Sequence, residues 1–145
     1  MHSGKNIIII LIDGGRLDRA IKSKVFANLN SVFFSQAITY APYTTSAMHA
    51  FISGVYGHRS GANSYWHVFE FKKNKFKTLA AYLQENEYET YSDCHSQIIL
   101  PKVGFDNFNV YDEKNTNLIE RHSRLLNEMK SITDKGKKFF LYLNI

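Results

Sequence analysis

Two stretches of the chain are apolar at consecutive positions, without the alternation of a strand that has one face in water. Residues 6–12 are almost entirely isoleucine and leucine, and residues 138–143 carry Phe139, Phe140 and Leu141 in succession. Such runs are typical of parallel strands covered on both faces by helices. We therefore predict a mainly parallel sheet in which these two strands lie side by side or one strand apart.

Between these runs, apolar residues recur with helical spacing. Phe76, Leu79, Ala80 and Leu83 predict a helix over about 75–86, since they follow the i, i+3, i+4, i+7 pattern. The other expected elements are helices within 16–35, from 44 to a stop at Gly54 and from 118 to 132, short strands at 37–40 and 88–93, and a loop at 55–72. This order predicts an α/β fold with helices on both faces of the sheet.

The composition fits one globular domain with an anionic partner. The 145 residues are 44% hydrophobic, which excludes a disordered chain, and their formal net charge is +5. The basic residues are dispersed around predicted elements, so we expect no nucleic-acid partner. The single cysteine, Cys94, excludes an internal disulfide. The apolar run before Asp13 is too short to span a membrane and has no cleavage site after it, so a cytoplasmic location is predicted.

Two residues place candidate chemistry at the ends of these elements. Asp13 directly follows the first strand, where a carboxylate is a natural cation ligand, although Asp-Gly is also a common turn pair. Thr44 opens a helix, where a hydroxyl can act as a nucleophile, but Thr44, Thr45 or Ser46 could equally cap that helix. If Asp13 and Thr44 share a metal, their side-chain oxygens should lie roughly 4–6 Å apart, given bonds of ~2 Å.

These residues also form blocks that resemble the sulfatase branch of the alkaline-phosphatase superfamily. In that family an apolar strand ends in Asp, with a spaced Arg and Asp after it, and the nucleophile opens a second block that closes in Ser-Gly. The matching positions are Asp13, Arg16 and Asp18 in the first block, Thr44, Gly54, Tyr56, His58 and Gly61 in the second, and the weaker blocks 104–108 and 139–143. The resemblance runs nearly end to end but covers the N-terminal part of a family domain.

The resemblance implies an alkaline-phosphatase-like three-layer sandwich, with residues 1–145 as its N-terminal portion and the fold incomplete at the C-terminus. It implies metal-assisted cleavage of a sulfuric or phosphoric ester, with Asp13 as metal ligand and Thr44 as nucleophile, or Thr45 in its place. His58 and Arg59, on the loop after the helix, would contact the anionic substrate. The cofactor would be a divalent metal ion, and one oxygen ligand does not distinguish calcium, magnesium, manganese and zinc.

The chain departs from the family pattern at four positions. Formylglycine sulfatases have Cys or Ser, then Pro two residues on and Arg four residues on, where this chain has Thr44, Ser46 and Met48. Threonine cannot supply the formylglycine aldehyde, so the closer resemblance is to phosphodiesterases and phosphoglycerol- or phosphoethanolamine-type transferases, which form a phospho-threonine. Gly14 stands where the family often has a second acid, which removes a possible metal ligand.

A non-catalytic remnant or anion-binding module is the alternative function. The family completes its metal site with residues farther along the chain, so we expect no metal-dependent turnover from these 145 residues alone, and an exposed apolar surface at an unpaired sheet edge. Among the remaining residues, Arg16 and Asp18 are expected to form a structural pair. His49 is expected on the helix surface or packed beside Ala50, and Cys94 in the core.

Overall fold

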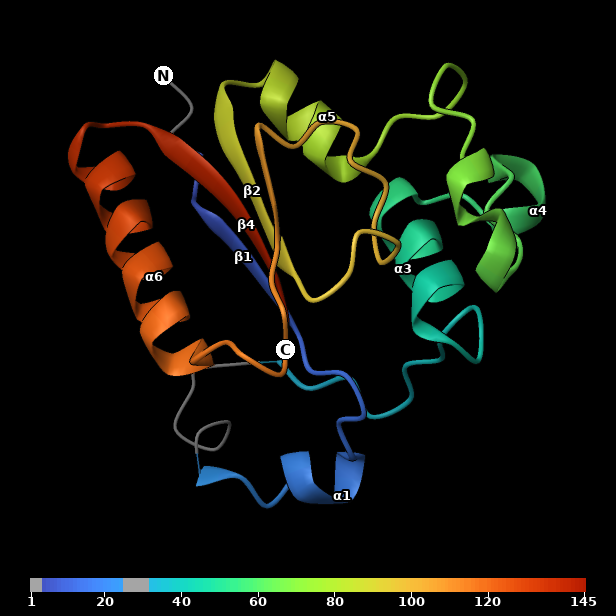
Figure 1. Cartoon of the computed structure of the whole chain (residues 1–145), viewed down its shortest axis with the longest axis horizontal. Coiled ribbons are helices and arrows are strands. Elements are labelled where there is room, and N and C mark those ends of the chain that lie inside the picture. Colours follow the sequence, from blue (N-terminus) through green and yellow to red (C-terminus); the bar gives the residue numbers. More distant parts are fainter. Residues whose placement is uncertain (1–3, 25–31) are drawn as a thin grey trace.

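The protein is a small α/β fold built on one parallel sheet (Figure 1). The computed structural model describes residues 4–24 and 32–145. Its strands lie in the order β1-β4-β2-β3, and each pair is parallel. The elements are β1 (Ile7–Leu11), α1 (Leu17–Ala20), α3 (Thr44–Ser53), α4 (Gly57–Ser60), the 3-10 helix η1 (Tyr65–Glu70), α5 (Leu79–Glu85), β2 (Tyr88–Cys94), β3 (Asn107–Val110), α6 (Leu118–Asp134) and β4 (Lys138–Asn144).

The two apolar runs form neighbouring strands, as the sequence predicts. β1 pairs with β4 in a register that runs from Ile7 opposite Phe140 to Leu11 opposite Asn144. β4 also pairs with β2, so it is a central strand and its apolar side chains are buried. Because the strands are parallel, their carboxyl ends meet at one edge of the sheet, where such folds hold ligands.

Helices cover both faces of this sheet (Figure 1). α6 packs on the face to which Phe139, Leu141 and Leu143 point. Residues of α3 and α5 pack on the opposite face, which receives Phe140 and Tyr142. The predicted α/β class, with a parallel sheet between helices, is therefore confirmed.

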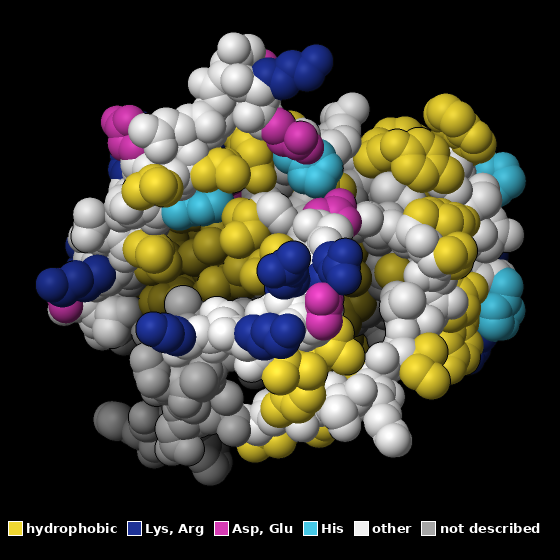
Figure 2. Space-filling model, turned by 90° about the horizontal axis from the view of Figure 1, so that it is seen from below, with side chains coloured by type: hydrophobic (Ala, Val, Ile, Leu, Met, Phe, Trp, Pro, Cys, Tyr) yellow, Lys and Arg dark blue, Asp and Glu magenta, His cyan; other side chains and the backbone are white. Residues whose placement is uncertain are grey.

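β1 differs from the prediction because only one of its faces is covered. Its burial alternates: Ile7, Ile9 and Leu11 pack against the core, but Ile8 and Ile10 are 46% and 56% exposed. The physical reason is position, since β1 is an edge strand and the buried cluster against α6 contains residues of β4 and β2 but, among the described residues, none of β1. The expected exposed apolar surface is present, and Figure 2 shows hydrophobic side chains in a hollow at the end of the molecule that carries α1.

Several predicted element boundaries are wrong. Of the helix predicted within 16–35, the structure has α1 at Leu17–Ala20, and residues 25–31 lie outside the described part. Residues 37–40 are not a strand; the Tyr40 ring stacks on Tyr56 and its hydroxyl accepts a hydrogen bond from the Gly57 amide, which holds this segment as a loop. The predicted loop at 55–72 contains α4 and η1, and β3 was missed because four residues are too few to establish an alternating pattern.

No helix in the described part of the chain is long and apolar enough to cross a membrane.

Candidate active site

Asp13 lies immediately beyond β1 at the carboxyl edge of the sheet. Its amide donates to the Ile145 carbonyl at 2.7 Å, which extends the β1–β4 pairing by one step. The next residue, Gly14, has a φ of 66°, a conformation that glycine adopts without strain. Asp13 Oδ1 also accepts the Gly14 amide at 2.9 Å, so the turn-forming role is real. The carboxylate is exposed and has capacity for further partners.

Thr44 is the first residue of α3, and its hydroxyl does not cap the helix. The N-cap is Tyr43, with extended backbone and no side-chain hydrogen bond to the first turn. The Ser46 hydroxyl donates to the Ala62 carbonyl instead, and the Thr45 hydroxyl is buried without a partner. The capping alternative for Thr44, Thr45 and Ser46 is therefore wrong, whereas the predicted stop at Gly54 is confirmed by its left-handed φ of 64°.

The structure brings Asp13 and Thr44 together across 31 residues of sequence. Thr44 Oγ1 donates to the Asp13 carboxylate, 3.2 Å from Oδ2 and 3.4 Å from Oδ1. These oxygen–oxygen distances are shorter than the separation predicted for two ligands of one metal, because the two side chains bond to each other directly. A carboxylate at this distance can accept the hydroxyl proton, and the same oxygens can share a cation.

The N-terminus of α3 makes this corner favourable for an anion. The first amides of a helix have no partner within the helix, and the helix dipole places partial positive charge there. Here the amide of Ala47 already bonds to the Tyr43 carbonyl at 3.3 Å, so the amides without a partner among the described residues are those of Thr44, Thr45 and Ser46. A sulfate or phosphate oxygen is the kind of group that such amides bind.

His58 and Arg59 are not brought to Asp13 and Thr44. Both lie on α4 and are exposed. The His58 ring stacks on Tyr56 with ring centroids 6.0 Å apart, and the Arg59 guanidinium lies 5.9 Å from the centre of the Phe76 ring. Their role in substrate binding stays a prediction.

The sequence analysis missed Asn144, the last residue of β4. Asn144 is fully buried, and neither its amide oxygen nor its amide nitrogen has a hydrogen-bond partner among the described residues. The hydroxyl of Tyr142, two residues earlier on the same face, is likewise unpaired. Burial together with the charges of Cys94 and Asp13 raises the pKa of Tyr142, so this phenol stays protonated. The available signal was an asparagine inside an apolar strand, where polar residues are uncommon.

A second polar cluster lies on the α6 face. Asp93, at 1% exposure, accepts two hydrogen bonds from Arg121 Nε and one from a terminal nitrogen, at 2.5–3.1 Å. His122 Nε2 lies 3.4 Å from Asp93 Oδ2 but is not aligned for a hydrogen bond. The bidentate pair compensates the buried charge of Asp93 and fixes the start of α6 to the end of β2, which is a structural role.

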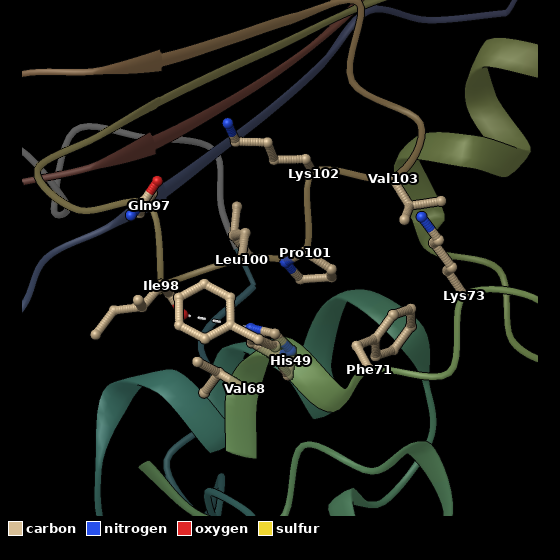
Figure 3. Close-up of a pocket in the computed structure, with 11 residues that line it drawn as sticks. His49, Val68, Phe71, Lys73, Gln97, Ile98, Leu100, Pro101, Lys102 and Val103 are labelled. Carbon is tan, nitrogen blue, oxygen red and sulfur yellow. Dashed lines mark hydrogen bonds between the residues drawn. The ribbon is translucent and has the colours of Figure 1, made fainter. Parts of the chain in front are cut away.

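The pocket drawn in Figure 3 lies between α3, η1 and the loop before β3, and has a volume of about 370 Å³. His49 forms part of its wall and is buried, which confirms the packing interpretation. Its Nε2 donates to the Ile98 carbonyl at 3.3 Å, and burial lowers the pKa of His49 to about 4. Lys73 and Lys102 are the cations among the pocket residues.

Other predicted residues lie as expected. Arg16 Nε and Asp18 Oδ1 are 2.9 Å apart on the surface, which confirms a structural pair near the turn. Cys94 is fully buried in the core, and burial raises the pKa of its thiol to about 11, so the thiol stays protonated at neutral pH. Met48, at the position where the formylglycine sulfatases have Arg, packs against the core.

Comparisons with known proteins identify no relative: no family model, curated protein or solved structure matches the chain. Within residues 4–24 and 32–145, no group of three or more His, Cys, Asp or Glu side chains is placed to hold a metal ion. The oxygens at the sheet edge are instead those of one carboxylate, one hydroxyl and one primary amide. Such a donor set fits a hard divalent cation better than zinc, which takes nitrogen and sulfur ligands in most protein sites.

Proposed function

We propose that the protein cleaves a sulfate or phosphate ester with Thr44 as nucleophile, as sulfatase-like enzymes of the alkaline-phosphatase superfamily do. The observation that supports this best is the hydrogen bond between Thr44 Oγ1 and Asp13 at the N-terminus of α3. Helix capping does not need this contact, and the turn after β1 does not need it either. A nucleophilic hydroxyl, in contrast, needs an adjacent base or cation.

The reaction would proceed by transfer of the phosphoryl or sulfuryl group to Thr44. A divalent cation held by Asp13 would neutralise charge on the ester oxygens. Thr44 Oγ attacks the phosphorus or sulfur atom, and its proton passes to the Asp13 carboxylate. The bond to the ester's alcohol oxygen breaks, and the alcohol leaves with a proton from water. The free amides of Thr44 and Thr45 would stabilise the developing negative charge.

The second half of the reaction decides between the proposed hydrolase and its alternative. If water attacks the phospho- or sulfo-threonine, the protein is a hydrolase or phosphodiesterase. If an alcohol such as glycerol attacks, it is a transferase of the phosphoglycerol or phosphoethanolamine type. A threonine at this position favours phosphoryl transfer over the formylglycine mechanism, because threonine cannot be converted to the formylglycine aldehyde.

The test is covalent labelling of Thr44. The purified chain, with MgCl2 or MnCl2, is mixed with excess aryl phosphodiester or aryl sulfate, quenched in acid and mapped by mass spectrometry. We expect a single stoichiometric transfer, with one phosphoryl or sulfuryl group on Thr44 and one equivalent of aryl alcohol released, without the continued turnover that we do not expect from these 145 residues alone. Thr44→Ala should abolish the label, because the variant has no hydroxyl at this position to accept the group. The control is Thr39→Ala, which removes an exposed hydroxyl whose hydrogen bond in the described part of the chain is to the Ala41 carbonyl.

A label on Thr45 instead would show that Thr45, the alternative residue, is the nucleophile. No label on either threonine, together with tight binding of inorganic phosphate or sulfate that Thr44→Ala weakens, would replace the enzyme with an anion-binding module.

A further inference from the structure

The starting observation is the energetic cost of Asn144. Its side chain is fully buried, and both of its polar atoms lack partners in the described part of the chain. A buried amide without hydrogen bonds is destabilising, and a bound cation would offset part of that cost. Among the described residues, four of the six buried side-chain atoms without a partner belong to three residues at this end of the sheet, namely Thr45, Tyr142 and Asn144.

The strand register places Asn144 beside Asp13. Asn144 lies opposite Leu11, and the Ile145 carbonyl accepts the Asp13 amide. By alternation Asn144 shares the face of Phe140 and Tyr142, which is the face covered by α3. Neighbouring strands lie about 4.8 Å apart and rise about 3.3 Å per residue, so positions 13 and 144 are diagonal neighbours at about 8 Å. The side-chain oxygens of Asp13 and Asn144 can lie closer together than these two backbone positions.

We propose that the Asn144 amide oxygen is a third oxygen ligand, with Asp13 and Thr44, for a hard divalent cation such as magnesium, calcium or manganese. The proposal rests on the proposed function and adds to it both a ligand and the class of metal. An amide oxygen is a neutral hard donor that these ions accept. The exposed carboxylate of Asp13 gives the cation a route in, although Asn144 itself is covered.

The test measures MnCl2 binding by calorimetry and by the electron paramagnetic resonance signal of free manganese, with thermal unfolding of each variant. Asn144→Leu removes both unpaired polar atoms at similar volume, and Asn144→Asp keeps the oxygen and adds charge. We expect Asn144→Leu to weaken binding by at least about tenfold, which is roughly the effect of one lost stabilising contact, and to leave the metal-free melting temperature equal or higher. Asn144→Asp should bind manganese at least as tightly as the wild type, and its melting temperature should rise most with MnCl2.

The outcomes separate this proposal from the function on which it rests. If Asn144→Leu binds manganese like the wild type while Asp13→Asn does not, the ligand role of Asn144 is overturned and the cation site of the proposed function stands. If the wild type binds no manganese, magnesium or calcium, both are overturned. If Asn144→Leu fails to fold, Asn144→Asp decides: failure of MnCl2 to raise its melting temperature overturns the proposal.

Discussion

At the scale of single residues, the candidate site illustrates which signals a sequence carries. Asp13 and Thr44 were predicted because each has a local signature, an acid after an apolar run and a hydroxyl before a helix. Asn144 and the Asp93–Arg121 pair were not, because their significance depends on burial and on partners distant in sequence. The partner of a side chain is a property of the fold, whereas its chemistry is a property of the residue.

The buried histidine predicts how stability depends on pH. The unfolded chain takes up a proton on His49 below about pH 6.5, whereas the folded protein keeps the ring neutral down to about pH 4, the pKa set mainly by burial. The unfolded state therefore binds more protons in this window, and the free energy of unfolding falls as the pH falls, by about 3 kcal/mol in all. Urea unfolding of the wild type and His49→Gln between pH 4 and 7 checks this. An equal pH dependence in the two proteins would contradict it.

For the buried ion pair, we expect the loss in free energy of unfolding to depend on whether one partner or both are removed. Arg121→Met leaves the Asp93 carboxylate buried without its cation, and we expect a loss of about 3–5 kcal/mol in the free energy of unfolding. The double variant Asp93→Leu with Arg121→Met removes both charges and should recover most of that loss. Urea unfolding at pH 7 measures both. Equal destabilisation by the single and double variants would show that packing, not charge, holds α6 here.

At the scale of elements, the long periodic segments were predicted well and the short ones poorly. α6 follows from its helical periodicity, and β1 and β4 follow from their uninterrupted apolar runs. The strand predicted at 37–40 was wrong and β3 was missed, because four residues carry too little pattern; contacts such as Tyr40 on Tyr56 fix the loop at 37–40. Side-chain capping was considered at the start of α3, where the structure shows none, whereas Thr78 caps α5.

Two buried threonines predict opposite responses to the same substitution. Thr78 Oγ1 accepts the Ala81 amide at 3.0 Å and donates to the Val103 carbonyl at 2.6 Å. Thr78→Val should therefore lower the free energy of unfolding by about 1–3 kcal/mol, since a cap is lost and buried groups are left unpaired. The Thr45 hydroxyl has no partner in the described structure, so Thr45→Val should be neutral or stabilising. Chemical unfolding compares them directly, and equal losses would contradict the contact assignment.

At the scale of the whole molecule, the exposed face of β1 predicts self-association. Ile8, Ile10 and Ile12 are 46–56% exposed on one side of an edge strand, and exposed apolar strands at a sheet edge favour association. We expect concentration-dependent self-association in sedimentation velocity, and Ile10→Lys should suppress it while changing the unfolding free energy by less than about 0.5 kcal/mol, as exposed substitutions do. Ile9→Lys is the matched control on the covered face, where Ile9 packs against the core, and it should destabilise the fold instead. A wild-type protein that stays monomeric at high concentration, or an Ile10→Lys variant that associates as strongly as the wild type, would show that this face does not mediate association.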